Sequence, residues 1–152
     1  MITLRSKNEK ETIRLGEIIG ANLEAGDVVC LDGQLGTGKT VIAKAIAVSL
    51  GVDEYVTSPS YTIINEYNGK LPVYHFDVYR IDDVDEMYEL GYEEYFFGTG
   101  VCIIEWASMI EELLPENCLF VKLKQAEDFN QREFEISGKE ETVLKIKEAF
   151  QC

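Results

Sequence analysis

A three-layer α/β/α sandwich with a mixed central sheet is the fold that this sequence predicts. Apolar runs typical of buried strands alternate along the chain with segments whose apolar residues recur at helical spacing. A buried run, a glycine-rich loop and a helix follow one another within residues 25–51, as in sheets built from parallel strands. Two β-rich runs around an Asn-Gly dipeptide, and a late strand at 132–137, add antiparallel pairs.

The N-terminal segment is expected to form a short edge strand at residues 2–4 and then a helix. Ser6 and Glu9 have the spacing of a capping box, which places a helix start in this region. Apolar residues then recur at helical spacing, so the helix should run from about Asn8 to Leu23.

The central segment supplies the strand and helix on either side of the glycine-rich loop. The run 25–33 is apolar and bounded by glycines, which is typical of a core strand. The helix after the loop covers 40–51 and ends at Gly51. Residues 60–80 are rich in β-formers, and Asn68-Gly69 in their middle favours a tight hairpin.

The C-terminal half continues the alternation of helices and strands. Its apolar periodicity and its glycine positions set the expected boundaries. The expected elements are a helix at 82–91, a strand at 100–107, a helical segment at 107–116, strands at 118–123 and 132–137, and a terminal amphipathic helix at 139–151.

Length and composition indicate one globular domain spanning 1–152. The chain is 46% hydrophobic and 28% charged, which is ordinary for such a domain. No apolar stretch approaches a membrane span, and the first residues have no apolar run of signal-peptide type, so we expect a cytoplasmic protein without membrane contact. Four cysteines without a C-x-x-C pair and a single histidine argue against a metal cluster or a disulfide framework.

The net charge of −14 restricts the partners of this chain. Residues 81–121 contain eleven acidic residues and neither lysine nor arginine. An acidic surface repels phosphate backbones, so autonomous binding of nucleic acid is not expected. The acidic stretch is either a solvated surface that aids solubility or a docking face for a basic partner.

The glycine-rich loop has the pattern of a phosphate-binding loop, or P-loop. Gly33, Gly38, Lys39 and Thr40 fit G-x-x-x-x-G-K-[ST], with Gly36 inside the pattern. Glycines let successive N–H groups point at phosphates, and the next helix directs its positive end at the same anion. The lysine reaches the outer phosphates and the threonine hydroxyl ligates Mg²⁺. A plain glycine-rich turn would lack the strand before and the helix after, so a P-loop NTPase-like fold that binds ATP and Mg²⁺ is predicted.

The expected nucleotide contacts comprise this loop, the start of its helix and one threonine farther along the chain. They are Gly33, Leu35, Gly36, Thr37, Gly38, Lys39, Thr40, Val41 and Thr62.

Two carboxylates end β-rich runs and are the candidate acids. Asp77 closes VYHFD and Glu105 closes VCIIE, and the carboxyl ends of parallel strands face the ligand crevice. We assign Asp77 to the metal and Glu105 to orienting the attacking water, although the two roles are interchangeable at this point. Lys39, Asp77 and Glu105 are therefore the candidate catalytic residues, and Thr40, Asp77 and Glu105 the candidate metal ligands.

Other polar and aromatic residues carry weaker signals. The hydroxyl-rich segment 57–62 is either a turn or a loop that senses the terminal phosphate. Trp106 is expected in the core by default, and His75 is expected to be a packed or partly exposed neutral imidazole rather than a ligand. Arg80 fits a local ion pair, a phosphate contact or a partner contact equally well.

The ordered set of motifs resembles the TsaE family, formerly YjeE. The matching segments are LDGQLGTGKT, VTSPSYTIINEY, YHFDVYR, LGYEEYF and IIEWA, which together cover roughly Val28 to Ala107. The departures are small, namely Ser60 where threonine is common and IEWA where VEWP or VEWA is usual. Residues after Leu114 carry little of the family signature.

The resemblance implies a small ATPase of bacterial tRNA threonylcarbamoyladenosine synthesis that acts with TsaD and TsaB. TsaD transfers the threonylcarbamoyl group to adenosine 37 of tRNAs that read codons beginning with A, and TsaB is its scaffold. ATP binding by the TsaE subunit is implied to promote assembly, and hydrolysis to reset the complex. The resemblance also implies that Lys39, Thr40, Asp77 and Glu105 form the nucleotide and magnesium site, and that 57–62 is a switch.

Three other functions remain open from the residues alone. A small P-loop kinase generally needs several arginines around its phosphates, and this chain has four with none between Arg80 and Arg132. A GTPase is disfavoured because no N-K-x-D-type segment is found. The third is a non-catalytic ATP sensor that recruits a partner, and Glu105→Ala distinguishes it from an ATPase. In an ATPase this variant should keep ATP affinity but lose hydrolysis, whereas unchanged turnover would favour the sensor.

Overall fold

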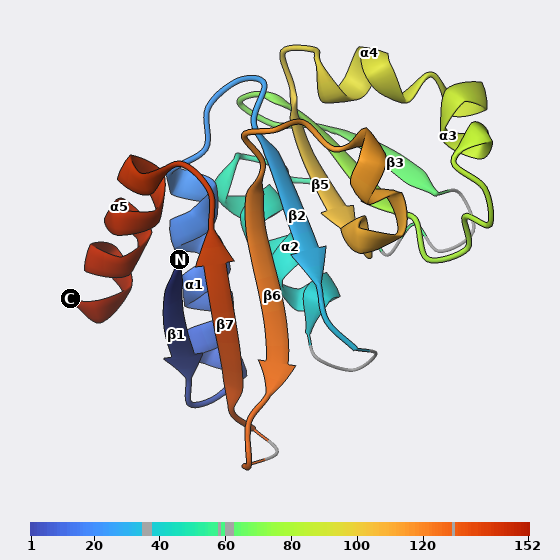
Figure 1. Ribbon diagram of the computed structural model, residues 1–152. Helices are drawn as coiled ribbons and strands as arrows, with labels where there is room; N and C mark the ends of the chain where they lie inside the picture. The colour runs from blue at the N-terminus through green and yellow to red at the C-terminus, as the bar shows by residue number, and fades with distance from the viewer. Residues whose placement is uncertain (35–37, 58, 60–62, 129) are drawn as a thin grey trace.

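The computed structural model describes residues 1–34, 38–57, 59, 63–128 and 130–152 (Figure 1). Strands and helices alternate along most of this chain, as the sequence predicted. In chain order the elements are β1 (Ile2–Ser6), α1 (Glu9–Ala21), β2 (Val28–Asp32), α2 (Lys39–Ser49), β3 (Ile64–Asn68), β4 (Pro72–Asp77), α3 (Asp85–Leu90), α4 (Tyr92–Phe96), β5 (Val101–Glu105), the 3₁₀ helix η1 (Ala107–Leu113), β6 (Leu119–Gln125), β7 (Arg132–Ser137) and α5 (Glu140–Gln151).

The strands of the described chain form one mixed sheet with the order β1-β7-β6-β2-β5-β4-β3. Its centre, β6-β2-β5-β4, is parallel. β7 lies antiparallel to both β6 and β1, and β3 lies antiparallel to β4. The predicted antiparallel hairpin, the edge position of β1 and the antiparallel late strand are therefore confirmed.

Helices on both faces of the sheet complete the three layers, and each face has its own core. α1, α2 and α5 cover one face, which we call the α2 face, and Figure 1 shows α1 and α2 behind the strands. α3, α4 and η1 pack on the opposite face, the η1 face. Alternation along β2 fills both cores, because Val29 and Leu31 face α2 whereas Val28 and Cys30 face η1.

Close packing of α1 on α2 depends on glycines in α1. A β-carbon on Gly16 would lie 2.5 Å from the Ala45 Cβ, and one on Gly20 would lie 1.7 Å from the Ser49 Oγ. Neither position has room for a larger side chain unless the helices move apart. The helix that follows the P-loop is thus held against its neighbour almost backbone to backbone.

Two details at the ends of elements differ from the sequence expectation. The N-cap of α1 is Asn8, whose side chain accepts a hydrogen bond from the Glu11 N–H at 2.9 Å. Ser6, the predicted cap, ends β1 and its hydroxyl lies 2.7 Å from that of Thr12. Both residue types cap helices well, so spacing alone chose the wrong one.

The hairpin also differs in detail, because its loop comprises residues 69–71 rather than a two-residue turn. Gly69 is needed there for close approach: a β-carbon would lie 2.4 Å from the Leu50 carbonyl oxygen. Two further differences lie in the η1-face layer. The segment after β5 is a 3₁₀ helix with a kink at Ile110, and the short helix α4 was not predicted as a separate element.

Within the part of the chain that the structure describes, no helix combines the length and the apolar character that crossing a membrane requires. The four cysteines are free thiols, with Cys30, Cys102 and Cys118 buried and Cys152 exposed. The three buried cysteines thus pack as small apolar side chains of the core on the η1 face.

Candidate phosphate-binding site

The carboxyl ends of three adjacent parallel strands bring the predicted site together. Asp77 at the end of β4 is the register partner of Glu105 at the end of β5, and Glu105 is in turn the partner of Leu31 in β2. The P-loop leaves β2 at this same edge of the sheet and leads into α2 (Figure 1). The two candidate acids therefore lie beside the start of the helix that follows the loop.

Lys39 begins α2 and is held by the loop's own backbone. Gly38, the residue before it, has φ 100°, a left-handed conformation that favours glycine. The Lys39 Nζ donates hydrogen bonds to the carbonyl oxygens of Gly33 at 2.5 Å and Gln34 at 2.9 Å. Only 5% of Lys39 is exposed, and this burial lowers the pKa of its ammonium, an effect that the nearby carboxylates partly oppose. The lysine is thus aimed into the loop that its sequence pattern assigns to phosphate.

A chain of hydrogen bonds runs from Thr40 through Glu105 to His75. The Thr40 hydroxyl donates to Glu105 Oε1 at 3.1 Å, and His75 Nε2 lies 2.5 Å from Glu105 Oε2. Glu105 is 2% exposed and His75 1%. Of the eleven acidic residues in 81–121, Glu105 alone is buried, which sets it apart from the acidic surface around it.

Asp77 and Asp32 complete the acidic surroundings of the lysine. Asp77 is 9% exposed, and its Oδ1 accepts a hydrogen bond from the Tyr79 N–H at 3.1 Å. Asp32 was not among the predicted site residues; its Oδ1 accepts bonds from the Ser108 N–H at 3.2 Å and hydroxyl at 3.0 Å. Both carboxylates act on the Lys39 ammonium electrostatically, as does Glu105. Asp32 ends β2 as Glu105 ends β5, and that shared strand-end position is the signal that could have identified it.

Trp106 packs against the edge of the core on the η1 face and also covers the lysine. Its backbone has φ 64°, an uncommon left-handed conformation for a residue with a large side chain. Its ring lies 3.9 Å from the Lys39 Nζ and 4.7 Å, centroid to centroid, from the ring of Tyr79. The expectation of a core tryptophan is confirmed in part, because Trp106 is partly buried against the core of the η1 face and also makes a cation–π contact at the site.

The remaining predicted contacts are only partly within the described chain. Gly33, Gly38 and Val41 flank Lys39 and Thr40 as the P-loop pattern requires. The segment 57–62 is described at two positions, of which Thr57 is held by Tyr67, whose hydroxyl accepts from the Thr57 N–H at 3.2 Å. The predicted contacts that lie outside the described residues are Leu35, Gly36, Thr37 and Thr62.

The donor set at this edge suits a magnesium ion that is shared with phosphates. Thr40, Asp77 and Glu105 offer oxygen atoms only, which are the ligands that Mg²⁺ prefers. No group of three His, Cys, Asp or Glu residues within the described chain is arranged to hold a metal by itself.

The fold and the site together define a P-loop NTPase-like α/β sandwich, in which a strand, the loop and a helix face acidic strand ends. Comparison with known families identifies the branch of that class. The family model described as "Threonylcarbamoyl adenosine biosynthesis protein TsaE" matches residues 6–134. The chain belongs to the TsaE family.

Individual relatives agree with this assignment. The chain is 48% identical over 125 residues to the tRNA threonylcarbamoyladenosine biosynthesis protein TsaE of Bacillus subtilis, covering 82% of this chain and 78% of the relative. The protein of the same name from Treponema pallidum is 40% identical over 125 residues, covering 82% and 93%. The crystal structure of Bacillus subtilis YdiB superposes with a TM-score of 0.79 at 38% identity, covering 99% of this chain and 93% of that one.

Proposed function

We propose that this chain binds ATP with Mg²⁺ at its P-loop and hydrolyses it as a subunit of tRNA threonylcarbamoyladenosine synthesis. The observation that carries this proposal is the meeting of Lys39 and Thr40, at the start of α2, with the buried carboxylate of Glu105. Membership of the TsaE family supplies the pathway.

The residues of the chain divide the work as follows. Backbone N–H groups at the start of α2 bind phosphate, and the Lys39 ammonium exchanges its carbonyl partners for phosphate oxygens. Thr40, Glu105 and Asp77 hold the magnesium ion, which when bound neutralises charge on the phosphates. One of the two carboxylates also orients the attacking water, and we assign this role to Glu105. Burial of the lysine and Glu105 strengthens these charge interactions.

We propose that this subunit does not itself form the new bond on tRNA. The free energy of ATP binding and hydrolysis is used to assemble and reset the complex. In the proposal, ATP binding promotes assembly with TsaD and TsaB, and hydrolysis resets the complex after TsaD has modified adenosine 37 of tRNAs that read codons beginning with A. The exposed acidic residues between 81 and 121 support a subunit that does not hold the tRNA itself.

Hydrolysis with and without the two partners tests the proposal. ATP turnover by the purified chain should rise when TsaB and TsaD are added together, and Lys39→Ala should abolish the rise. Turnover that is the same with and without the partners, or that survives in Lys39→Ala, would contradict it. A product assay with candidate acceptors, in which only ADP and inorganic phosphate are expected, separates hydrolysis from a kinase reaction.

Direct tRNA binding is a second test. The isolated chain at physiological salt should show no tRNA binding at micromolar concentration, because its net charge of −14 opposes contact with phosphates. Micromolar binding would overturn the idea that the chain acts without holding the RNA.

A further inference from the structure

We propose that His75 is a positioning residue that fixes the Glu105 carboxylate for catalysis; this inference rests on the hydrolysis proposed above. The sequence motifs place His75 two residues before Asp77 but give it no role of its own. In the structure it makes the shortest contact of the Glu105 side chain, with 2.5 Å between Nε2 and Oε2.

Strand alternation places the imidazole where it can act on Glu105. Val73, His75 and Asp77 are alternate residues of β4, so their side chains point to one face of the sheet, and Val73 belongs to the core on the α2 face. Glu105 is the register partner of Asp77 on β5, so His75 lies one diagonal step from it on the same face. The imidazole thus reaches Glu105 from the core side of the strand end.

The contact with His75 occupies one carboxylate oxygen of Glu105 and leaves the other for the site. An ionised carboxylate only accepts hydrogen bonds, so the proton of this bond is carried on Nε2 of His75. With Oε2 held in this way, Oε1 receives the Thr40 hydroxyl at 3.1 Å. His75 therefore fixes the orientation of the Glu105 carboxylate, so that its other oxygen faces Thr40 and the start of α2.

The second ring nitrogen, Nδ1, argues that His75 does more than fill space in the core. His75 Nδ1 is buried and finds no hydrogen-bond partner among the described residues. Burying a polar atom without a partner costs free energy, and an aliphatic side chain of similar size would avoid that cost. The feature that an aliphatic side chain could not supply is the donor to Glu105.

A set of substitutions separates positioning from simple packing. His75→Gln places an amide donor near the position of Nε2, whereas His75→Met has a similar volume and no donor. Single-turnover ATP hydrolysis by the full-length chain, metal-free nucleotide affinity and the midpoint of thermal unfolding are measured for each. Val73→Ala on the same face of β4 is the matched control, because Val73 is fully buried in the core cluster of the α2 face.

We expect His75→Met to lower the hydrolysis rate about ten- to a hundredfold, as is usual when a partner that orients a functional ligand is lost. Metal-free nucleotide affinity should stay within about twofold, because the loop backbone and Lys39 are unchanged. His75→Gln should recover most of the rate. Val73→Ala should lower the unfolding midpoint while keeping the rate of the folded protein.

The outcomes distinguish this inference from the proposed function. If Glu105→Gln hydrolyses ATP normally, the proposed role of Glu105 fails. If Glu105→Gln is inactive but His75→Met hydrolyses at the original rate, the positioning role of His75 is overturned. Equal loss in the Gln and Met variants overturns it as well. Should His75→Met not fold, His75→Asn replaces it, because its shorter amide stays polar but does not reach Glu105; normal hydrolysis by that variant is again contrary to the inference.

Discussion

The two faces of the sheet differ in the length of the helices that cover them and in the residue types of their cores. The α2 face is covered by three helices of eleven to thirteen residues, with a mainly aliphatic core and glycines at the contact of α1 and α2. The η1 face carries the five- and six-residue helices α4 and α3 and the kinked 3₁₀ helix η1. Its core is rich in aromatic edge-to-face pairs, such as Phe76 with Phe96 at 5.3 Å and Tyr92 with Phe96 at 5.2 Å.

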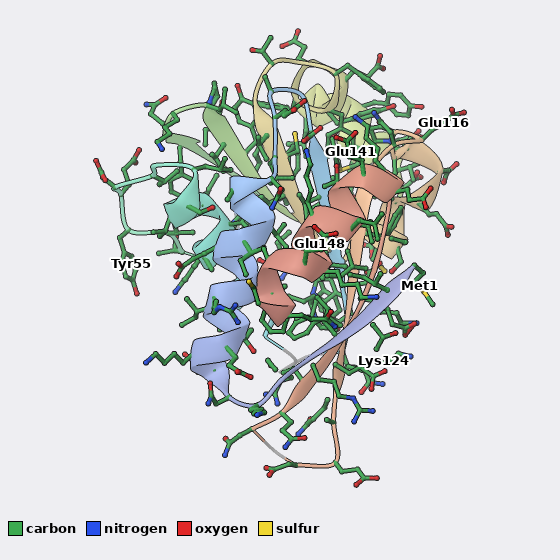
Figure 2. All side chains as sticks on the ribbon, turned by 90° about the vertical axis from the view of Figure 1, so that its left-hand side faces the viewer. Met1, Tyr55, Glu116, Lys124, Glu141 and Glu148 are labelled. Atoms are coloured by element: carbon green, nitrogen blue, oxygen red, sulfur yellow. The ribbon has the colours of Figure 1, made fainter. Side chains whose placement is uncertain are left out.

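The η1 face is also incompletely covered. On the η1 face, β6 and β7 border a concavity of about 950 Å³, and its lining includes Phe120, Lys122, Gln34 and Trp106. Figure 2 shows Lys124 of β6 and Tyr55, which follows α2, projecting to opposite sides of the sheet. Ten of the acidic residues in 81–121 lie exposed on the elements of the η1 face and the turns that join them.

Because of this difference, most of the candidate site residues lie on the closely packed α2 face and not among the exposed groups of the η1 face. Lys39, Thr40, His75 and Glu105 belong to α2 or to the strand faces beneath it, so their positions depend on the closely packed layer. The η1 face contributes Trp106 as a cover for the lysine. Changes on the α2 face should therefore affect hydrolysis or global stability, whereas changes of exposed groups on the η1 face should affect neither strongly.

The largest expected contrast compares two acids of the same acidic stretch. Glu105→Ala should keep ATP affinity but lower hydrolysis by about a hundredfold or more, because a buried, preorganised group at the reacting phosphates is lost. The exposed Glu111→Ala should behave like the unchanged protein. Isothermal titration calorimetry measures the ATP affinity, and a phosphate-release assay measures the hydrolysis rate. Turnover that is the same in Glu105→Ala and in the unchanged protein would mean that Glu105 does not catalyse hydrolysis, and would favour a role in which ATP binding alone recruits a partner.

The second contrast concerns stability of the α1–α2 contact. Gly16→Ala should lower the free energy of unfolding by about 1–3 kcal/mol, because the new methyl group meets the Ala45 Cβ at 2.5 Å. Denaturant titration measures the loss, and the exposed Glu17→Ala on the same helix is the control. Adding Ala45→Gly should make the double variant less destabilised than the sum of the single changes. Additive losses would show that the helices do not compete for this space.

The third contrast uses the lowered pKa of Lys39. Phosphate binding needs the charged ammonium, so metal-free nucleotide affinity should fall as pH rises and Lys39 loses its proton. Because burial lowers this pKa, the fall should begin below the ordinary lysine value of 10.5 and approach about tenfold per pH unit. Lys39→Arg keeps its charge throughout and should give a flatter profile. Identical profiles between pH 8 and 10.5 would show that Lys39 is not the titrating group.

The smallest expected effect is at the open edge of the η1 face. Arg5 and Glu133 form an ion pair at 3.3 Å between β1 and β7, and the Arg5 side chain is 71% exposed. Arg5→Ala should change the free energy of unfolding by about 0.5 kcal/mol or less, because water screens exposed pairs. A loss of several kcal/mol in a denaturant titration would mean that this edge supports the fold more than its exposure suggests.

The strands β2 and β5 were predictable because both of their faces are buried. β2 and β5 read as apolar runs that each end in a carboxylate; glycines lie on both sides of β2, and Gly100 comes directly before β5. The short elements of the η1 face were less predictable. α4 has only five residues, and the 3₁₀ form of η1 depends on how it packs, which periodicity does not express.

The site was predictable to the extent that local sequence carries its chemistry. The P-loop pattern identified Lys39 and Thr40, and position at a strand end identified Asp77 and Glu105. The contact of His75 with Glu105 depends on the register between β4 and β5, which a single sequence does not give. The position of Trp106 depends on an unusual left-handed backbone conformation that no local residue pattern announced.

The stacking of Trp106 on Lys39 gives the protein an intrinsic optical reporter. The chain has one tryptophan, so all indole emission originates from a ring whose centroid lies 3.9 Å from the Lys39 Nζ. A ligand that draws this ammonium towards phosphate removes a positive charge from the indole and changes the spectrum without any attached dye. Rapid mixing with nucleotide would then time the arrival of phosphate at the loop separately from the release of product.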